Sequence, residues 1–271
     1  MGVSAYGTWA SSLDALISYR HVGCRSVATD DGHATGGFAL RSDLRLAAGV
    51  LGAPVAIAVL DTAGINIDGV HILALTRVDV HLFEGAGAVD RIVVLGTVVR
   101  RARTMVFTEA RLVDAADHGR TIGFGTADWV VIEPTPPGFA YVDPGPGVPD
   151  EPPMPPLWGA YGAEPLAGGG FEIATLSAQI GAEHMHHGPM LVVTEAAAIE
   201  AIKDAGVIPT GVQTLSTRLV KAATRPPFRT RAEVLTATPS TVACRAELYD
   251  ADGNTVATTF VTVPPDRGEH A

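Results

Sequence analysis

The sequence has few of the features that characterise disulfide-rich, nucleic-acid-binding and membrane proteins. Its 271 residues include only two cysteines, which excludes a disulfide-built scaffold and favours a reducing compartment. Charged residues make up only 18% of the chain and the net charge is -10, which argues against a general nucleic-acid binder but leaves room for a local basic pocket. No uncharged run approaches the ~18 residues that span a bilayer, and no basic segment leads into an apolar one at the N-terminus. These absences predict a cytoplasmic protein with no nucleic-acid partner, membrane span or signal peptide.

Apolar residues are plentiful, and proline is concentrated in one place. Hydrophobic residues make up 47% of the sequence, enough to build a core in one large domain or two small ones. Ten of the 19 prolines lie between Pro134 and Pro156, where they favour an extended connector. We therefore predict four segments: an N-terminal extension (1–35), a first unit (36–133), a proline-rich linker (134–167) and a second unit (168–265).

The two predicted units have the same layout. Each begins with a glycine run and an extended segment, continues with a proline-started apolar helix, and ends with four strand-like runs. The glycine-led segments are 36–40 and 168–173, and the helices are 54–65 and 189–205. The strands are 71–83, 91–101, 104–113 and 121–132, and then 212–222, 229–237, 241–249 and 255–263. Turn signals at 114–119 and 250–253 match as well. The pattern predicts an α+β fold with a curved antiparallel sheet around a long central helix in each half. Residues 1–35 have no copy, and we expect a packing extension with a short helix near 9–19.

A histidine-rich turn precedes the second predicted helix. The run His184-Met-His-His-Gly-Pro189 is followed by an apolar stretch that carries Glu195. On a helix, Glu195 shares its face with Leu191, Ala198 and Ile202, so its carboxylate is expected to be desolvated and its pKa raised. Such an acid suits general-base or nucleophilic work near neutral pH, although an ordinary helix glutamate is the simpler alternative.

The start of this helix offers main-chain donors. The N–H groups at Gly188 and after it have no partner within the helix, so they could polarise the carbonyl of an ester or thioester. A glycine there also allows close approach to the main chain. The alternative is a plain helix entry. His186 and His187 could orient the acid, bind the substrate or shape the turn. Because no third well-spaced ligand follows, we expect no metal.

This layout resembles the hotdog-fold thioesterase family, in its tandem or double-hotdog form. It is most similar to the phenylacetate-pathway and 4-hydroxybenzoyl-CoA-type enzymes, which act on acyl-CoA. The family typically has a His-Gly-Gly turn with Asp or Glu nine residues after the histidine. Glu195 lies nine residues after His186 and eight after His187. In the first half, Gly52 stands nine residues before Asp61, so the acid is kept and the histidine is lost.

The resemblance implies further site residues. Asp61 is either a second acid or a relic with a structural role. Gln179 lies upstream of the turn, near the place where related enzymes carry a polar Asn or Gln, although its spacing does not match. CoA phosphates could be held by arginines of either of two clusters, or these arginines could simply be solvated. The clusters are Arg225, Arg229 and Arg231, and Arg100, Arg101 and Arg103.

The expected function is hydrolysis of an acyl-CoA thioester, with Glu195 as general base or nucleophile. CoA would be part of the substrate, and no separate cofactor is expected. The resemblance also implies a homo-oligomer, a dimer of double hotdogs. Two alternatives remain open: a non-catalytic acyl-CoA or lipid-binding protein, and a hotdog enoyl-CoA hydratase with a different Asp/His pair.

Overall fold

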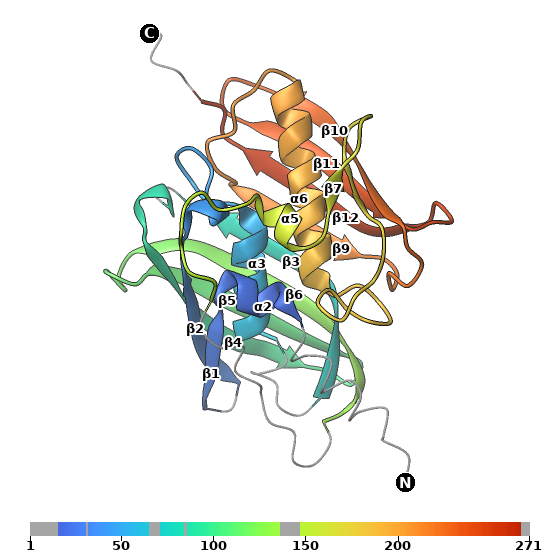
Figure 1. Cartoon of the computed structure of the whole chain (residues 1–271). Helices are drawn as coiled ribbons and strands as arrows, with labels where there is room; N and C mark the ends of the chain where they lie inside the picture. Colours follow the sequence, from blue (N-terminus) through green and yellow to red (C-terminus); the bar gives the residue numbers. More distant parts are fainter. Residues whose placement is uncertain (1–15, 31, 65–70, 84–85, 136–146, 267–271) are drawn as a thin grey trace.

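One continuous antiparallel sheet organises the molecule. The structure, a computed structural model, describes residues 16–30, 32–64, 71–83, 86–135 and 147–266. Twelve strands pair in the order β1-β2-β4-β5-β6-β3-β9-β12-β11-β10-β8-β7, and helices α3 and α6 lie on one face of this sheet (Figure 1). The helices are α2 (Ile17–Val22), α3 (Gly52–Thr62), α5 (Leu157–Ala160) and α6 (His187–Asp204), with 3-10 turns at Ser42–Leu44 and Ala86–Ala88. The strands are β1 (Arg25–Asp30), β2 (His33–Ala39), β3 (His71–Leu82), β4 (Arg91–Arg101), β5 (Met105–Asp114), β6 (Thr121–Pro134), β7 (Glu164–Pro165), β8 (Phe171–Ile173), β9 (Thr214–Leu219), β10 (Phe228–Ala237), β11 (Val242–Tyr249) and β12 (Thr255–Val263).

The predicted elements are found close to their predicted bounds. All eight strand-like runs form strands, and both central helices form. Each helix begins two residues earlier than predicted, so Pro54 and Pro189 occupy the third helical position instead of the first. The third position also lacks an intrahelical partner for its N–H, so proline is tolerated there for the same reason.

The two halves join through β3 and β9 into one sheet. These strands pair antiparallel from Arg77↔Arg218 to His81↔Thr214. The two predicted sheets, one in each half, are therefore continuous, because each half uses its edge strand to pair with the other half. Read outward from this junction, the strand order is β3-β6-β5-β4-β2-β1 on one side and β9-β12-β11-β10-β8-β7 on the other. The element order is thus the same in both directions.

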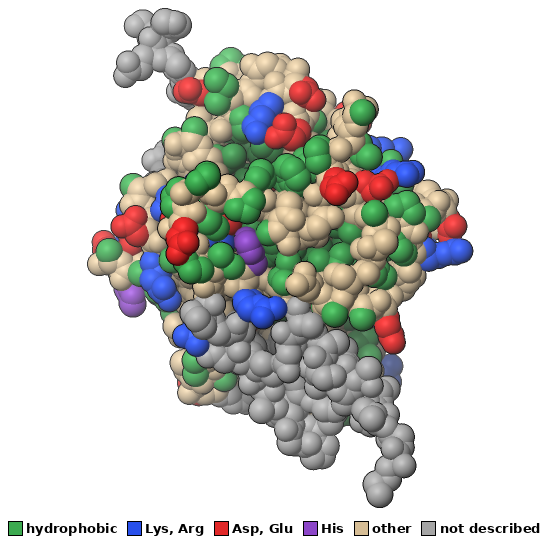
Figure 2. All heavy atoms as spheres, viewed as in Figure 1, with side chains coloured by type: hydrophobic (Ala, Val, Ile, Leu, Met, Phe, Trp, Pro, Cys, Tyr) green, Lys and Arg blue, Asp and Glu red, His purple; other side chains and the backbone are tan. Residues whose placement is uncertain are grey.

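The core lies between the sheet and the helices. All eleven residues of α3 are buried, while α6 exposes residues near its C-terminal end. Along β4 and β5, buried and partly exposed side chains alternate, as expected for a sheet with one face on the core. Figure 2 shows charged side chains of both signs mainly around the periphery of the helix-side face, with apolar ones in its middle. Among the described residues, no helix is both long and apolar enough to cross a membrane.

The segment between the halves is more structured than a purely extended connector. Within its described residues, α5 forms one helical turn and β7 pairs with β8. The Trp158 and Phe171 rings lie 5.1 Å apart, and Leu157 and Tyr161 are buried. Apolar side chains that follow the last of these prolines therefore anchor this segment: Trp158 packs on Phe171 of the second half, and the Tyr161 hydroxyl donates to the Ser18 carbonyl oxygen on α2. The domain boundaries themselves stay a prediction, and most of the helix predicted at 9–19 lies outside the described residues.

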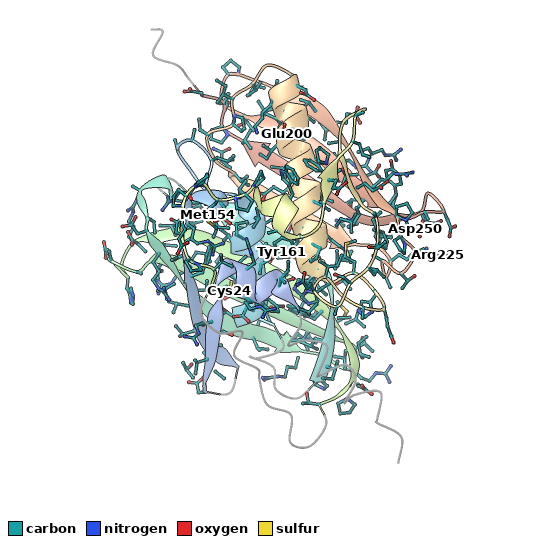
Figure 3. The ribbon with its side chains drawn as sticks, viewed as in Figure 1. Cys24, Met154, Tyr161, Glu200, Arg225 and Asp250 are labelled. Atoms are coloured by element: carbon teal, nitrogen blue, oxygen red, sulfur yellow. The ribbon has the colours of Figure 1, made fainter. Side chains whose placement is uncertain are left out.

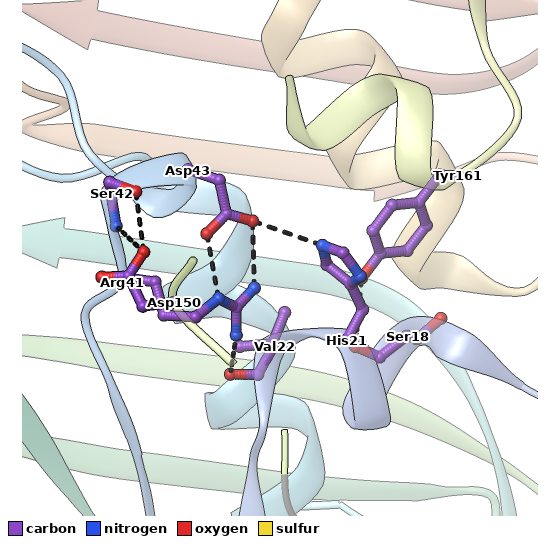
Figure 4. Close-up of polar contacts among 8 residues, drawn as sticks. All are labelled: Ser18, His21, Val22, Arg41, Ser42, Asp43, Asp150 and Tyr161. Atoms are coloured by element: carbon purple, nitrogen blue, oxygen red, sulfur yellow. Dashed lines mark hydrogen bonds and ion pairs between the residues drawn. The ribbon is translucent and has the colours of Figure 1, made fainter. Parts of the chain in front are cut away.

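A buried ion pair fixes α2 against the first half (Figure 4). Arg41 donates from Nε and Nη2 to the two carboxylate oxygens of Asp43, at 3.0 and 2.9 Å. His21 Nε2, on α2, lies 3.3 Å from Asp43 Oδ2. Burial alone would raise the pKa of Asp43, but the hydrogen bonds with His21 and Arg41 and the Arg41 charge outweigh it and lower that pKa. The carboxylate is therefore held ionised by its partners.

Replacing Asp43 by Asn tests this ion pair. The Arg41 and Asp43 side chains are only 6% and 0% exposed, so the change leaves a buried guanidinium without its counter-charge. We expect the free energy of unfolding in urea at pH 7 to fall by about 3 kcal/mol. Glu200→Gln, which breaks the half-exposed pair with Lys203, is the matched control, and it should cost less than about 1 kcal/mol. Equal losses in the two variants would contradict the assignment.

Candidate active site

Glu195 reaches across the junction of the two halves. Its side chain leaves α6 and lies on the first residues of α3, where Oε1 accepts the Gly52 N–H at 2.5 Å and Oε2 accepts the Ala53 N–H at 3.0 Å. Glu195 is only 2% exposed. The acid of the second half therefore meets the helix start of the first half.

The start of α3 suits a carboxylate for physical reasons. The first N–H groups of a helix lack intrahelical acceptors, and the helix dipole places partial positive charge there. Gly52 also makes room. A Cβ at that position would lie 2.9 Å from the Leu215 Cβ and 3.0 Å from both Val212 Cγ1 and Glu195 Oε1. Any larger residue would push away the Glu195 carboxylate or the side chains of Val212 and Leu215.

Burial changes the acidity of Glu195. Desolvation raises its pKa from 4.5 to about 7, although the hydrogen bonds from Ala53 and Gly52 act in the opposite direction. Near neutral pH, both the carboxylate and the carboxylic acid are therefore populated. A group with this pKa can take up and release a proton at little cost, which is what a general base requires.

This geometry corrects the predicted partner of Glu195. Gly188 was expected to hold a carbonyl beside it. The two residues are seven positions apart on one helix, about 10 Å along its axis, and Glu195 points to the other half. The donors beside the acid belong to Gly52 and Ala53. The sequence carried a signal for Gly52, which stands nine residues before Asp61, but nothing in it paired that helix start with Glu195.

The start of α6 is covered by α2. A Cβ on Gly188 would collide with the Ser18 side chain, so Ser18 uses the space that we expected a substrate to use. The Ser18 Oγ lies 3.1 Å from His186 Nδ1, and the Tyr19 hydroxyl lies 2.9 Å from His187 Nε2. Two successive α2 residues thus bind the two successive histidines of the turn.

The histidines form a compact cluster with Tyr19. The His186 and His187 ring centroids are 3.7 Å apart, and Tyr19 packs edge-on against both. Burial lowers the pKa of His186 to about 3 and that of His187 well below 6.5, with a further contribution from a neighbouring histidine in each case. Both rings are neutral near pH 7, so they act here as hydrogen-bonding groups that hold α2.

Gln179 and Asp61 lie in different surroundings. Gln179 is exposed and lines a cavity of about 380 Å³ between the 159–164 and 174–180 segments, and its main-chain oxygen accepts the Ile17 N–H at 2.9 Å. Asp61 is 2% exposed on α3, and its main-chain oxygen accepts a hydrogen bond from Ser26 at 3.1 Å. Neither residue makes a described contact with Glu195.

In one of the two arginine clusters predicted to hold CoA phosphates, each arginine has an acidic partner. Arg225 pairs with Asp252 at 2.5 Å, Arg229 with Glu172 at 2.7 Å, and Arg231 with Glu247 at 2.5 Å. Figure 3 places Arg225 with Asp250 at the outer edge of the second half. Arg100, Arg101 and Arg103, at the β4–β5 turn, are exposed. In the described part of the chain, no three His, Cys, Asp or Glu side chains form a group that could hold a metal ion.

Comparison with solved structures identifies the fold. No protein-family model matches the sequence, and no curated protein matches it either. A conserved protein of unknown function with a hot dog fold from Alicyclobacillus acidocaldarius aligns with a TM-score of 0.61 at 13% identity, over 92% of this chain and 97% of that one. An acyl-CoA thioesterase II from Mycobacterium marinum aligns at 0.55 and 12%, over 96% and 100%. A 12:0-ACP thioesterase from Umbellularia californica aligns at 0.58 and 12%, over 86% and 94%. The chain therefore has the hotdog fold, and the 4-hydroxybenzoyl-CoA-type subgroup stays a prediction.

Replacing Gly188 by Ala tests the contact between α2 and α6. The added methyl group collides with Ser18, so α2 must shift, and we expect thermal unfolding to reveal a loss of about 1–3 kcal/mol. Gly159→Ala is the control, because a Cβ there meets nothing within 4 Å. Adding Ser18→Gly to the Gly188→Ala chain should recover part of the loss. A Gly188→Ala protein as stable as the control would refute the contact.

The pH dependence of stability tests the surroundings of Glu195. Its pKa is about 7 in the fold against 4.5 ordinarily, so the folded state holds the proton more tightly. The contribution of Glu195 to stability is therefore full below pH 4.5 and is lost as the pH rises to about 7, by up to about 3 kcal/mol. The measurement is the difference in unfolding free energy between the wild type and Glu195→Gln at each pH. That difference should fall across this window, and a rise would contradict the burial.

Proposed function

We propose that the chain is a double hotdog that hydrolyses an acyl thioester, with one working site at the junction of α3 and Glu195. One observation carries this proposal: a buried acid with a pKa near neutrality lies on main-chain donors that belong to the other half. The thioesterases among the similar structures support the reaction class, although their identity to this chain is low.

The chemistry assigns a separate task to each group. Deprotonated Glu195 takes a proton from water as the water oxygen attacks the thioester carbonyl carbon. The developing oxyanion needs a donor, and the N–H group of either Gly52 or Ala53 can supply it while the other keeps its bond to Glu195. Collapse of the intermediate breaks the C–S bond, and the proton on Glu195 passes to the leaving thiolate. The products are a carboxylic acid and a free thiol.

Binding must rearrange the site, because Glu195 occupies both donors in this structure. A substrate carbonyl has to replace a carboxylate oxygen on at least one of them. The Ala53 N–H, which bonds only to Oε2, can be freed while the Gly52 N–H keeps its bond to Oε1. The carboxylate then keeps one anchor while its other oxygen faces the water.

The second helix start is proposed not to act. Ser18 fills the space beside Gly188, and the neighbouring histidines bind α2 residues. We propose acyl-CoA as the substrate. In that case Arg225, Arg229 and Arg231 would have to exchange their carboxylate partners for phosphates. The cytoplasmic location and the dimer of double hotdogs also stay predictions.

A second candidate is an acyl-thioester-binding protein without activity. It is favoured by the same residue, because a 2% exposed glutamate with both oxygens hydrogen-bonded also serves as a fixed helix cap. Thiol release over a panel of acyl-CoA esters, together with direct binding of the same esters, separates the two. Tight binding with no free CoA from any ester would favour the binding protein.

Glu195→Gln tests the catalytic assignment. The change keeps the size of the side chain and removes the base, so kcat should fall ~10²-fold or more. Asp61→Asn should have a much smaller effect, because α2 covers the start of α6. The assay is initial-rate thiol release with the best ester, and circular dichroism checks that both variants are folded. If Asp61→Asn abolishes turnover and Glu195→Gln does not, the site has been assigned to the wrong acid.

A further inference from the structure

Thr194, the residue before Glu195, belongs to a chain of three buried hydroxyl groups. Its Oγ1 lies 2.7 Å from the Oγ1 of Thr259 on β12, which lies 2.9 Å from the Oγ1 of Thr217 on β9. The three residues are at most 1% exposed. This series of hydrogen-bonded hydroxyls thus connects the middle of α6 to two strands of the sheet.

The hydroxyl protons in this chain have a definite direction. Thr194 Oγ1 lies 2.7 Å from the Met190 carbonyl oxygen and 3.2 Å from that of Leu191, and it donates its single proton to them. It must then accept from Thr259, which in turn accepts from Thr217. Three hydroxyls in an apolar core are costly unless each is bonded, and valine would fill the same space without that requirement. The hydroxyls therefore add a directional constraint that apolar packing would not supply.

Strand β9 holds both parts of the candidate site. Thr217 ends the hydroxyl chain, and Leu215, on the same buried face of β9, packs beside Gly52. The Val212 N–H, just before β9, donates to the Val50 carbonyl oxygen at 3.0 Å, close to the start of α3. Strand β9 therefore helps to position both the donors at the start of α3 and helix α6, which carries Glu195.

The helical geometry makes the hydroxyl chain matter for the acid. Successive residues on an α-helix point about 100° apart around the axis. With Thr194 bound toward the sheet, Glu195 is turned away from it toward α3. A small rotation of α6 would carry the carboxylate off the Gly52 and Ala53 N–H groups.

We propose that Thr194 is a positioning residue for Glu195, and that its hydroxyl chain sets the rotation of α6 so that the carboxylate meets the start of α3. The consequence for turnover rests on the proposed function. The consequence for the placement of Glu195 does not.

The experiment compares Thr194→Val, which keeps the shape but removes the hydroxyl, with Thr194→Ser, which keeps the hydroxyl. Thr108→Val is the matched control: Thr108 is 2% exposed in the first half and hydrogen-bonded to Trp129 Nε1 at 3.0 Å. We expect Thr194→Val to lower kcat by about 10- to 100-fold, because small displacements of a catalytic group are costly, while KM stays nearly constant. Thr194→Ser should retain most of the kcat, and Thr108→Val should lose stability only.

A second readout does not depend on activity. The titration of Glu195 is followed through the stability difference from Glu195→Gln, measured in the wild-type and in each Thr194 background. In Thr194→Val the midpoint should move from about 7 toward 4.5, because a displaced carboxylate gains water. In Thr194→Ser it should stay near 7.

The outcomes separate the two proposals. If no acyl thioester is hydrolysed by the wild type, the proposed function fails, and the titration alone decides the role of Thr194. If Thr194→Val unfolds more easily but keeps both its kcat and its Glu195 midpoint, the hydroxyl chain is merely structural and the inference is overturned. Equal losses of kcat in Thr194→Val and Thr108→Val would overturn it as well.

Discussion

The first N–H groups of a fully buried helix must find acceptors inside the protein, and this requirement shapes the centre of the molecule. Helix α3 is buried along its whole length, so water cannot satisfy its start. Glu195 satisfies it from the other half of the chain. The same bonds hold Glu195 in a buried place, and this burial raises its pKa to about 7 although the bonds themselves act in the opposite direction. One contact thus both satisfies the first N–H groups of α3 and places Glu195 where it can serve as a general base.

The local elements could be predicted from the sequence, because they depend on neighbouring residues. Apolar periodicity, proline at the helix starts and the Asp-containing turns located both central helices and eight strands. The turn that starts at Asp250 shows why: its carboxylate accepts the main-chain N–H groups of Asp252 and Asn254 within the same loop. The Glu195 surroundings were also expected, since its apolar helix face implied burial.

The pairing between distant segments could not be predicted in this way. The sequence predicted that Glu195 would act beside the main-chain donors of Gly188, on the same helix. The donors that contact it, those of Gly52 and Ala53, lie in the other half. Nothing in the pattern of 17–22 indicated that Ser18 and Tyr19 would bind the histidines. Such contacts depend on how whole elements pack, which a single sequence does not record. The junction of β3 with β9 was missed for the same reason, since either strand would read equally well as a free edge.

The span between Glu195 and Gly52 has a consequence for the order of events during synthesis. The two residues are 143 positions apart. The ribosome therefore completes the first half long before the carboxylate that satisfies the start of α3 exists, and β3 emerges without β9 to cover its edge. Until α6 and β9 have been made, the nascent first half carries bare main-chain donors on a helix meant to be buried, together with an open strand. The contacts that complete the first half can therefore form only after the second half has been made, despite the repeated element order.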